Sequence, residues 1–417
     1  MCIFAKTRKY MIELKGKYCK DCVIFSDNLD EDTLSTIYNV LDNPVFENQT
    51  IRIMPDVHNG NGIVIGFVST IGDYVCPAHV GSDIGCSISA IMFNGTMNPE
   101  DYPLFDHRVR ENIMFGFDLQ KKRIFDMKDF FKFVKKAYSS ACGAWPEMIE
   151  YPDTVNEKWL SSVLKRVNMD EATFYKGIGS IGSGNHFIEV GKVYDETGTT
   201  ELGGMTVTIH TGSRNFGTKV FKYWDKISKR NHPNCPSGYL CDEDLKGYLS
   251  DMILCQAYAA YNHKVIQDVI VKLALKFGLK EYDRIMSTHN YIDPVDRLIR
   301  KGAIRSHASE KMIIPFNMRD GLIIAEGTSF KHWLCSANHG SGRCMSRSAA
   351  KKNIDVNDFK ETMKDVFSTS VGVGTLDEAP QAYKDTDTIK EIMKETCNIL
   401  YTVKPVINIK AKNSADE

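Results

Sequence analysis

The chain has 417 residues, of which 43% are hydrophobic and 25% charged, a composition typical of folded globular proteins. Its 52 Lys and Arg residues nearly balance its 53 Asp and Glu residues. This balance excludes a protein held to nucleic acid by bulk positive charge, although it leaves room for a local basic patch. The chain has no apolar run long enough for a transmembrane helix and no apolar core of a secretory signal at its N-terminus, so we expect a cytoplasmic protein with no membrane partner.

The organisation of the chain is uniform. No segment has the composition of a linker and no repeat is evident, which predicts a single domain over residues 1–417 with a frayed polar tail at 411–417. The 12 cysteines are too sparse for a disulfide scaffold and predict thiols, metal ligands or core residues. Cys19 and Cys22 form a C-x-x-C pair without a second pair at zinc-ribbon spacing, so we expect surface or half-buried thiols there.

In chain order, the first elements are short strands. Residues 62–69 and 87–93 are rich in β-branched and apolar residues and are bounded by Gly, Asp and Asn. Apolar residues at helical spacing then predict helices over 129–141 and 157–167, before a strand at 205–210.

The strongest helical pattern covers residues 245–277, which contain Gly247 and no proline. It predicts one long helix or two helices joined by a bend. Strands follow near 312–325, and helices near 357–367 and 387–400. Because strands and helices alternate irregularly, the pattern predicts an α+β fold instead of a regular βαβ series.

Potential metal ligands stand beside glycine or other small residues in several short segments. They are Asp83 and Cys86 in VGSDIGC, His186 in GSGNHFIE, His210 in HTGSR, His289 before Asn290, and His339 in HGSGR. Each residue alone is also typical of a turn or of a core position, and spacing does not decide whether the segments converge.

If these segments converge, the ligand set has a chemical meaning. A thiolate, a carboxylate and imidazoles suit Mn²⁺, Zn²⁺, Co²⁺ or Fe²⁺ better than Mg²⁺ or Ca²⁺. Such a set exceeds the needs of one four-coordinate ion and indicates a pair of metals bridged by Cys86, an arrangement suited to phosphoryl chemistry. The small residues after His339 suit a loop that wraps a phosphate, and Arg214, Lys301, Arg343 and Arg347 supply cations that are otherwise solvated surface charges.

Taken together, the motifs resemble the RtcB family of GTP-dependent tRNA-splicing and RNA-repair ligases, in a divergent bacterial or phage-like branch. The resemblance rests on MPDVHNGNG (54–62), VGSDIGC (80–86), GSGNHFIE (182–189), HTGSR (210–214), HN (289–290), RKGA (300–303), HGSGR with MSR (339–347), DEAPQAYKD (377–385) and KPVINIK (404–410), in the family's order. Motifs that run in one order along most of the chain are far more specific than a single glycine-rich loop.

The resemblance implies a single RtcB-like domain, with mixed or antiparallel sheets flanked by helices around a central metal site. It implies two Mn²⁺ ions, for which Zn²⁺ or Co²⁺ could substitute, held by Asp83, Cys86, His186, His210 and His289. His339 would attack GTP and carry GMP as a covalent intermediate, and Asp56 would assist the steps on RNA. The substrates would be RNA ends with a 2′,3′-cyclic phosphate or 3′-phosphate and RNA ends with a 5′-hydroxyl, with a helper protein as a further possible partner.

The resemblance also implies residues that contact the substrates. Contacts to the nucleotide would come from Asn185, Phe187, Glu189, Asn290, Asn317, Met318, Gly340, Ser341, Gly342, Tyr383 and Lys410. Contacts to RNA phosphates would come from Arg214, Lys301, Arg343 and Arg347.

The sequence departs from the family pattern at Asn61, where a lysine is usual, and at PFNMRD (315–320), where the family has P-G-S-M-G-T. These departures leave the choice between RNA repair and tRNA splicing open, and they bear on guanine selectivity. Two other functions also stay open: a dinuclear metal phosphohydrolase or cyclic phosphodiesterase, and an RNA-binding protein with a structural metal. Neither needs His339, so its presence in HGSGR favours the ligase.

Overall fold

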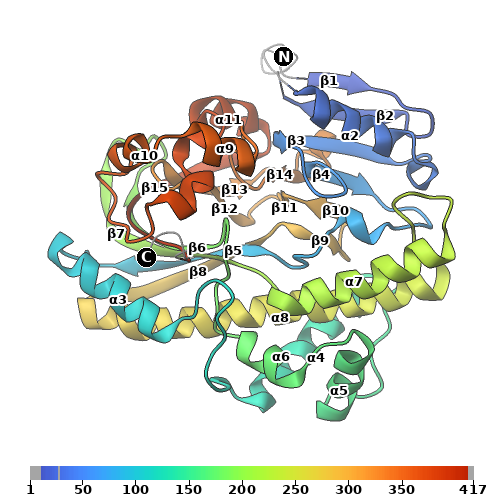
Figure 1. Cartoon of the computed structure of the whole chain (residues 1–417), viewed down its shortest axis with the longest axis horizontal. Helices are drawn as coiled ribbons and strands as arrows, with labels where there is room; N and C mark the ends of the chain where they lie inside the picture. The colour runs from blue at the N-terminus through green and yellow to red at the C-terminus, as the bar shows by residue number, and fades with distance from the viewer. Residues whose placement is uncertain (1–10, 27–28, 412–417) are drawn as a thin grey trace.

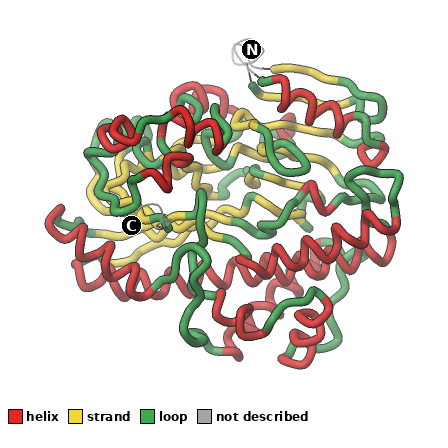
Figure 2. The backbone as a smooth tube through the Cα atoms, in the orientation of Figure 1, coloured by secondary structure: helices red, strands yellow, loops and turns green. Residues whose placement is uncertain are grey.

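The computed structural model describes residues 11–26 and 29–411 of the chain (Figure 1). Most of the predicted tail, residues 412–417, lies outside the described residues. Figure 2 shows the strands gathered in the middle of the molecule, with helices across its lower edge and over its upper left. This arrangement confirms the α+β class.

Two large sheets form the middle of the molecule. The N-terminal sheet has the strand order β1 (Met11–Leu14), β2 (Asp21–Phe25), β3 (Thr50–His58), β4 (Ile65–Thr70), β10 (Leu298–Lys301) and β9 (Asn290–Asp293). The central sheet has the order β12 (Lys311–Asn317), β13 (Gly321–Gly327), β15 (Cys397–Ile409), β6 (Phe187–Tyr194), β7 (Glu201–Thr211), β5 (Ser87–Asn94) and β8 (Lys280–Thr288). A small ladder pairs β11 (Ala303–Arg305) with β14 (Ser336–Asn338). The central sheet is antiparallel throughout, and the N-terminal sheet is mixed because β2 and β3 are parallel.

Helices cover these sheets. The α-helices are α2 (Glu31–Leu41), α3 (Tyr102–Asn112), α4 (Met127–Ala144), α5 (Glu157–Arg166), α6 (Glu171–Gly177), α7 (Arg214–Asn231), α8 (Asp242–Ala274), α9 (Arg347–Asn353), α10 (Val356–Thr362) and α11 (Thr386–Ile392). Short 3₁₀ turns are η2 (Pro44–Phe46), η3 (Pro77–His79), η4 (Pro99–Asp101), η5 (Leu275–Phe277), η6 (Lys331–Trp333), η7 (Val373–Glu378), η8 (Pro380–Ala382) and η9 (Met393–Glu395). Asp126 begins α4 by accepting hydrogen bonds from the backbone N–H groups of Lys128 and Asp129, which satisfies donors that the helix leaves unpaired.

Helix α8 is one continuous helix of 33 residues, without a bend that would divide it. Gly247 is a packing residue, since a Cβ there would lie 2.6 Å from the ring of Trp224. The N-terminal half of α8 packs in the apolar cluster that holds Ile51 and Phe67 of the N-terminal sheet. Its C-terminal half packs in the cluster that holds Val207 of the central sheet. The helix therefore packs against both sheets.

Three expectations need correction. The first predicted strand begins at Ile65 because the chain turns at Gly62, whose φ is 81°. The helix predicted at 357–367 ends at Thr362. The helix predicted at 387–400 ends at Ile392, because residues from Cys397 onward pair with β13.

The expectation for the C-x-x-C pair was also wrong. Cys19 and Cys22 are 0% and 2% exposed and pack in the same apolar cluster as Ile51. Burial raises the pKa of Cys22 to about 12, so this thiol stays protonated and behaves as a small apolar side chain.

Candidate metal and nucleotide site

The predicted metal ligands meet where four neighbouring strands of the central sheet begin or end. Cys86 precedes β5, His186 precedes β6, His210 lies near the end of β7 and His289 follows β8. The four strands are consecutive neighbours in the order β6, β7, β5 and β8. Because they are antiparallel, the starts of β5 and β6 lie beside the ends of β7 and β8, which brings the four side chains together.

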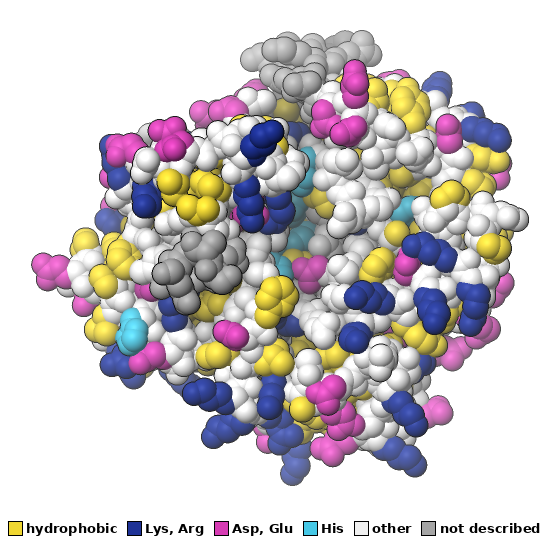
Figure 3. Space-filling view, viewed as in Figure 1, with side chains coloured by type: hydrophobic (Ala, Val, Ile, Leu, Met, Phe, Trp, Pro, Cys, Tyr) yellow, Lys and Arg dark blue, Asp and Glu magenta, His cyan; other side chains and the backbone are white. Residues whose placement is uncertain are grey.

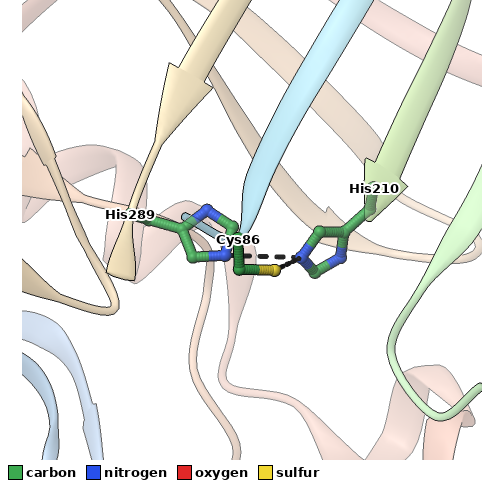
Figure 4. A group of neighbouring side chains, drawn as sticks. All are labelled: Cys86, His210 and His289. Carbon is green, nitrogen blue, oxygen red and sulfur yellow. Dashed lines mark hydrogen bonds between the residues drawn. The ribbon is translucent and has the colours of Figure 1, made fainter. Parts of the chain in front are cut away.

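The ligand atoms form two groups that share a thiol. Cys86 Sγ lies 3.3 Å from His210 Nε2, which lies 3.4 Å from His289 Nε2 (Figure 4). On its other side, Cys86 Sγ lies 3.4 Å from His186 Nε2, which lies 3.1 Å from Asp83 Oδ2. Each group is placed to hold a metal ion. Two ligands of a tetrahedral ion at metal–nitrogen distances of about 2.1 Å lie about 3.4 Å apart, so these spacings fit metal binding.

Backbone carbonyls fix the imidazoles. His186 Nδ1 is 3.0 Å from the carbonyl of Ile181, and His210 Nδ1 is 3.0 Å from that of Asn185. A carbonyl accepts only from an N–H, so Nδ1 carries the proton and Nε2 presents its lone pair to the centre. Burial also lowers the pKa of His210 and of His289 well below the usual value, which keeps both rings neutral as metal ligands must be.

The acidic ligands differ in their electrostatics. Burial is the largest influence on the pKa of Asp83 and raises it, but the neighbouring His186, Cys86 and His289 together outweigh burial and lower the pKa to about 2. Burial, together with the nearby Asp83, raises the pKa of Cys86 well above that of a free thiol. Cys86 would therefore lose its proton on binding a metal cation.

His339 stands beside this group and is held by Asp56. Its ring centroid lies 4.9 Å from that of His289. Its Nδ1 is 2.6 Å from Asp56 Oδ2, which also accepts the His339 backbone N–H at 3.1 Å. The carboxylate therefore holds the proton on Nδ1, and Nε2 has no hydrogen-bond partner among the described residues. Asp56 is fully buried, and its Oδ1 has no hydrogen-bond partner there either.

The small residues after His339 fit closely against the strand of Asp56. Gly342 has a φ of 73°, and a Cβ on it would lie 2.2 Å from the Asp56 carbonyl oxygen. Ser341 Oγ donates to the carbonyl of Phe316 at 2.9 Å. Only glycine at 342 allows this approach, so loop 340–342 is held next to both Asp56 and His339.

Several predicted nucleotide residues gather around Glu378. Lys410 Nζ is 3.1 Å from Glu378 Oε2 and 5.5 Å from the centre of the Phe187 ring. Tyr383 OH donates to the same Glu378 oxygen at 2.9 Å. On the strand paired with β15, Glu189 accepts from Asn408 at 2.8 Å, and burial raises its pKa to about 8.

Other predicted nucleotide residues are engaged in their own turns. Asn317 binds the side chain of Asp320 through its amide nitrogen at 2.8 Å. Met318 is 4% exposed and packs in an apolar cluster. Asn290 Oδ1 accepts the backbone N–H of Gly302 at 3.0 Å.

The predicted RNA-binding cations have protein partners in this structure. Arg347 Nη1 lies 2.8 Å from Asp377 and 2.9 Å from Glu378, and Arg343 donates to the carbonyl of Asp377 at 2.6 Å. The two acids stand in the motif DEAPQAYKD and were not assigned a role from the sequence. The only signal in the sequence was that these two acids stand side by side in a motif of the family.

The other two cations are bound to uncharged groups. Arg214 donates to the carbonyl of Gly116 at 2.7 Å and to Ser180 Oγ at 3.0 Å. Lys301 Nζ donates to the carbonyl of Asn61 at 2.8 Å, and burial lowers its pKa to about 8. Direct contact of these four cations with RNA stays a prediction.

Comparison with known proteins places these features in a family. Residues 36–411 match the family model described as tRNA-splicing ligase RtcB. The chain is 27% identical over 390 residues to the RNA-splicing ligase RtcB of Escherichia coli, with 86% of this chain and 90% of that protein covered. It is 25% identical over 455 residues to the tRNA-splicing ligase RtcB of Methanococcus maripaludis, with 93% and 92% covered. It is 27% identical over 422 residues to that of Nanoarchaeum equitans, with 86% and 87% covered.

Proposed function

We infer the reaction from the premise that this chain belongs to the RtcB family and is an RNA ligase. We propose that it joins RNA ends carrying a 2′,3′-cyclic phosphate or 3′-phosphate to RNA ends carrying a 5′-hydroxyl, with GTP as co-substrate and Mn²⁺ as the metal. The observation that carries the proposal is the arrangement of the two ligand groups around Cys86, with His339 beside them and held by Asp56.

The first step would use His339 as a nucleophile. With its Nδ1 proton held by Asp56, Nε2 presents a lone pair that attacks the α-phosphorus of GTP. A nitrogen–phosphorus bond forms as the bond to pyrophosphate breaks, and His339 keeps GMP. Asp83, Cys86, His186, His210 and His289 would hold Mn²⁺, which supplies positive charge to phosphate oxygens.

The later steps transfer GMP and then replace it. Water opens a cyclic phosphate to a 3′-phosphate, whose oxygen attacks the phosphorus of GMP and releases His339. The 5′-hydroxyl of the second RNA then attacks the activated 3′-phosphorus, and GMP leaves as the new phosphodiester forms. Asp56 Oδ1, buried without a described partner, is available to accept a hydrogen bond from a group in this reaction.

The nucleotide would lie between the metal groups and the Glu378 cluster. Lys410, Tyr383 and Phe187 offer a donor, a hydroxyl and an aromatic face in one place. Glu189, protonated near neutral pH, would donate a hydrogen bond instead of repelling phosphate. Loop 340–342 would wrap phosphate with backbone N–H groups.

We further propose that the protein acts in the cytoplasm. The cysteines described are free thiols, as expected in a reducing compartment. None of the described helices is long and apolar enough to cross a membrane.

A ligation assay tests the proposal. Purified protein is incubated with Mn²⁺, GTP and two RNA oligonucleotides, one ending in a 2′,3′-cyclic phosphate and the other beginning with a 5′-hydroxyl. We expect joined RNA with the unaltered chain and none with His339→Gln, while His107→Gln on an exposed face of α3 keeps full activity. Repeated turnover by the chain alone would show that no helper protein is required. Release of phosphate from the RNA without joining would instead favour the phosphohydrolase.

A further inference from the structure

The most exposed large hydrophobic side chain among those described is close to the metal site. Phe117 is 95% exposed, whereas Leu275, the next in order, is 62% exposed. Phe117 lies in the segment between α3 and α4, residues 113–126, which we call the tip segment. A single exposed apolar residue is common at a protein surface. What distinguishes Phe117 is how its backbone is held and what surrounds it.

The backbone on both sides of Phe117 is fixed. Before it, the carbonyl of Met114 accepts the N–H of Ile181 at 2.9 Å, and the N–H of Gly116 donates to the carbonyl of Gly182 at 2.8 Å. After it, the side chain of Gln120 is buried and donates to the carbonyl of Gly179 at 2.8 Å. These bonds tie the tip segment to residues 179–182. Phe117 is therefore presented to solvent on an anchored backbone.

Further contacts connect the tip segment to the metal ligands. Arg214 donates to the carbonyl of Gly116, the residue before Phe117, at 2.7 Å. A Cβ on Gly182 would lie 2.3 Å from Arg214 Nη1 and 2.5 Å from His186 Nδ1, so both side chains pack on this glycine. In Figure 1 the tip segment crosses the front of the molecule after α3. On that face, Figure 3 shows a hollow with histidine side chains inside it.

Positive charge follows Phe117 along the tip segment. Lys121, Lys122 and Arg123 are all exposed, and one exposed acid, Asp118, directly follows Phe117. Neither lysine forms an ion pair with a described residue within salt-bridge distance, whereas Arg123 lies over the rings of Phe125 and Tyr175. Lys121 and Lys122 are therefore available to an anion from solution.

We propose that Phe117 is a stacking platform for an unpaired base of the RNA that enters the site, and that Lys121 and Lys122 contact the phosphates beside that base. An aromatic ring gains from stacking on any base that exposes its face, and cations next to it follow the backbone. Because bases inside a duplex are already stacked, the platform selects single-stranded RNA ends. The inference rests on the proposed function and deepens it by naming the substrate class.

Binding of a fluorescently labelled single-stranded RNA with a 3′-phosphate, followed by anisotropy, tests the platform. We expect Phe117→Ala to weaken binding about five- to a hundredfold, the range of one base–aromatic stack, and Phe117→Trp to keep the affinity. Leu275→Ala is the matched control, since it truncates another exposed apolar side chain and should change nothing. A blunt duplex of the same sequence should bind Phe117→Ala and the unaltered chain equally.

The lysines have a separate readout. The double variant Lys121→Ala/Lys122→Ala should reduce the slope of log affinity against log salt by about 1.4, as expected for two phosphate contacts on a single strand. An unchanged slope would overturn the assignment of these lysines.

Two results for Phe117→Ala would overturn the platform. The first is an RNA affinity within about twofold of that of the unaltered chain. The second is a change in sedimentation with no change in RNA binding, which would make Phe117 a contact between copies of the chain. Labelling with GTP alone separates this proposal from the ligase mechanism. Phe117→Ala should keep the GMP adduct, and absence of that adduct in the unaltered chain would reject the mechanism while leaving the RNA-binding comparison intact.

Discussion

The buried carboxylate of Glu378 offers a quantitative test of the cluster at the nucleotide site. Glu378 is 3% exposed and lies 3.1 Å from Lys410 Nζ, 2.9 Å from Arg347 Nη1 and 2.9 Å from Tyr383 OH. Glu378→Gln keeps the shape of the side chain and removes its charge. Lys410, whose side chain is 4% exposed, then loses its anionic partner in a buried environment, which is costly.

The size of the effect follows from the pKa of Glu378. Burial opposes its ionisation, but Lys410, then Arg347 and Arg343, outweigh burial and lower the pKa from 4.5 to about 2. That difference corresponds to about 3 kcal/mol of folding free energy, of which the share from half-exposed Arg347 is reduced by solvent screening. Because the folded-state pKa is the lower one, this stability is fully present above the unfolded-state pKa of 4.5. It is lost as the pH falls toward 2.

Urea unfolding of the metal-free chain, followed by tryptophan fluorescence, measures this stability. At pH 7 we expect Glu378→Gln to lower the free energy of unfolding by about 3 kcal/mol, and the difference from the unaltered chain to shrink below pH 4.5. Glu361→Gln is the control, since Glu361 and its partner Lys364 are both exposed and their pair contributes little. Equal unfolding midpoints of Glu378→Gln and the unaltered chain at pH 7 would refute the view that Glu378 neutralises the buried Lys410.

Three further predictions concern the metal groups, the acid on β6 and the loop after His339. Cys86→Ala removes a ligand from both metal groups, so bound Mn²⁺ per chain, measured by elemental mass spectrometry, should fall to near zero. The control Cys255→Ala, which changes another buried cysteine, should keep its metal, and an unchanged metal content in Cys86→Ala would contradict the shared thiolate. Glu189 holds its proton up to about pH 8 in the folded chain but releases it near pH 4.5 when unfolded, so its burial lowers the stability progressively as the pH rises between these values. Glu189→Gln should therefore make the melting temperature depend less on pH in this window, whereas parallel plots of melting temperature against pH for the two proteins would reject the assignment. Gly342→Ala would place a Cβ 2.2 Å from the Asp56 carbonyl oxygen at a φ of 73°, so it should destabilise the chain by about 2 kcal/mol or more and displace Asp56 from His339. A melting temperature equal to that of the unaltered chain would show that loop 340–342 is not held there.

Elements whose periodicity agreed with their surroundings could be predicted from the sequence. The long pattern at 245–277 became α8, and the strands at 87–93 and 205–210 became β5 and β7, since each presents apolar side chains to a core. Ile389 and Ile392 also have helical spacing, but the helix predicted there was too long. Residues from Cys397 onward pair with β13 as part of β15 and so form a strand. Helix α7 was not predicted, although Phe216, Val220 and Trp224 recur every four residues within a mostly polar segment.

The candidate site, too, has a part that could be predicted from the sequence and a part that could not. Local motifs identified His186, His210 and His289 as potential ligands, because histidine beside small residues at strand ends is visible in sequence. Their convergence depends on the strand order β6, β7, β5 and β8, which connects distant parts of the chain. Partners of the cations were equally invisible, so the pairing of Arg347 with Glu378 emerged only in three dimensions.

The central claim is that His339 carries GMP. The purified chain, shown to hold Mn²⁺, is incubated with GTP labelled at the α-phosphate, denatured, digested and examined by mass spectrometry. The account predicts one GMP on the peptide that contains His339, labile to acid and stable to alkali as a phosphoramidate is, and absent from His339→Gln. Label on another residue, or no label on the metal-loaded chain, would contradict it.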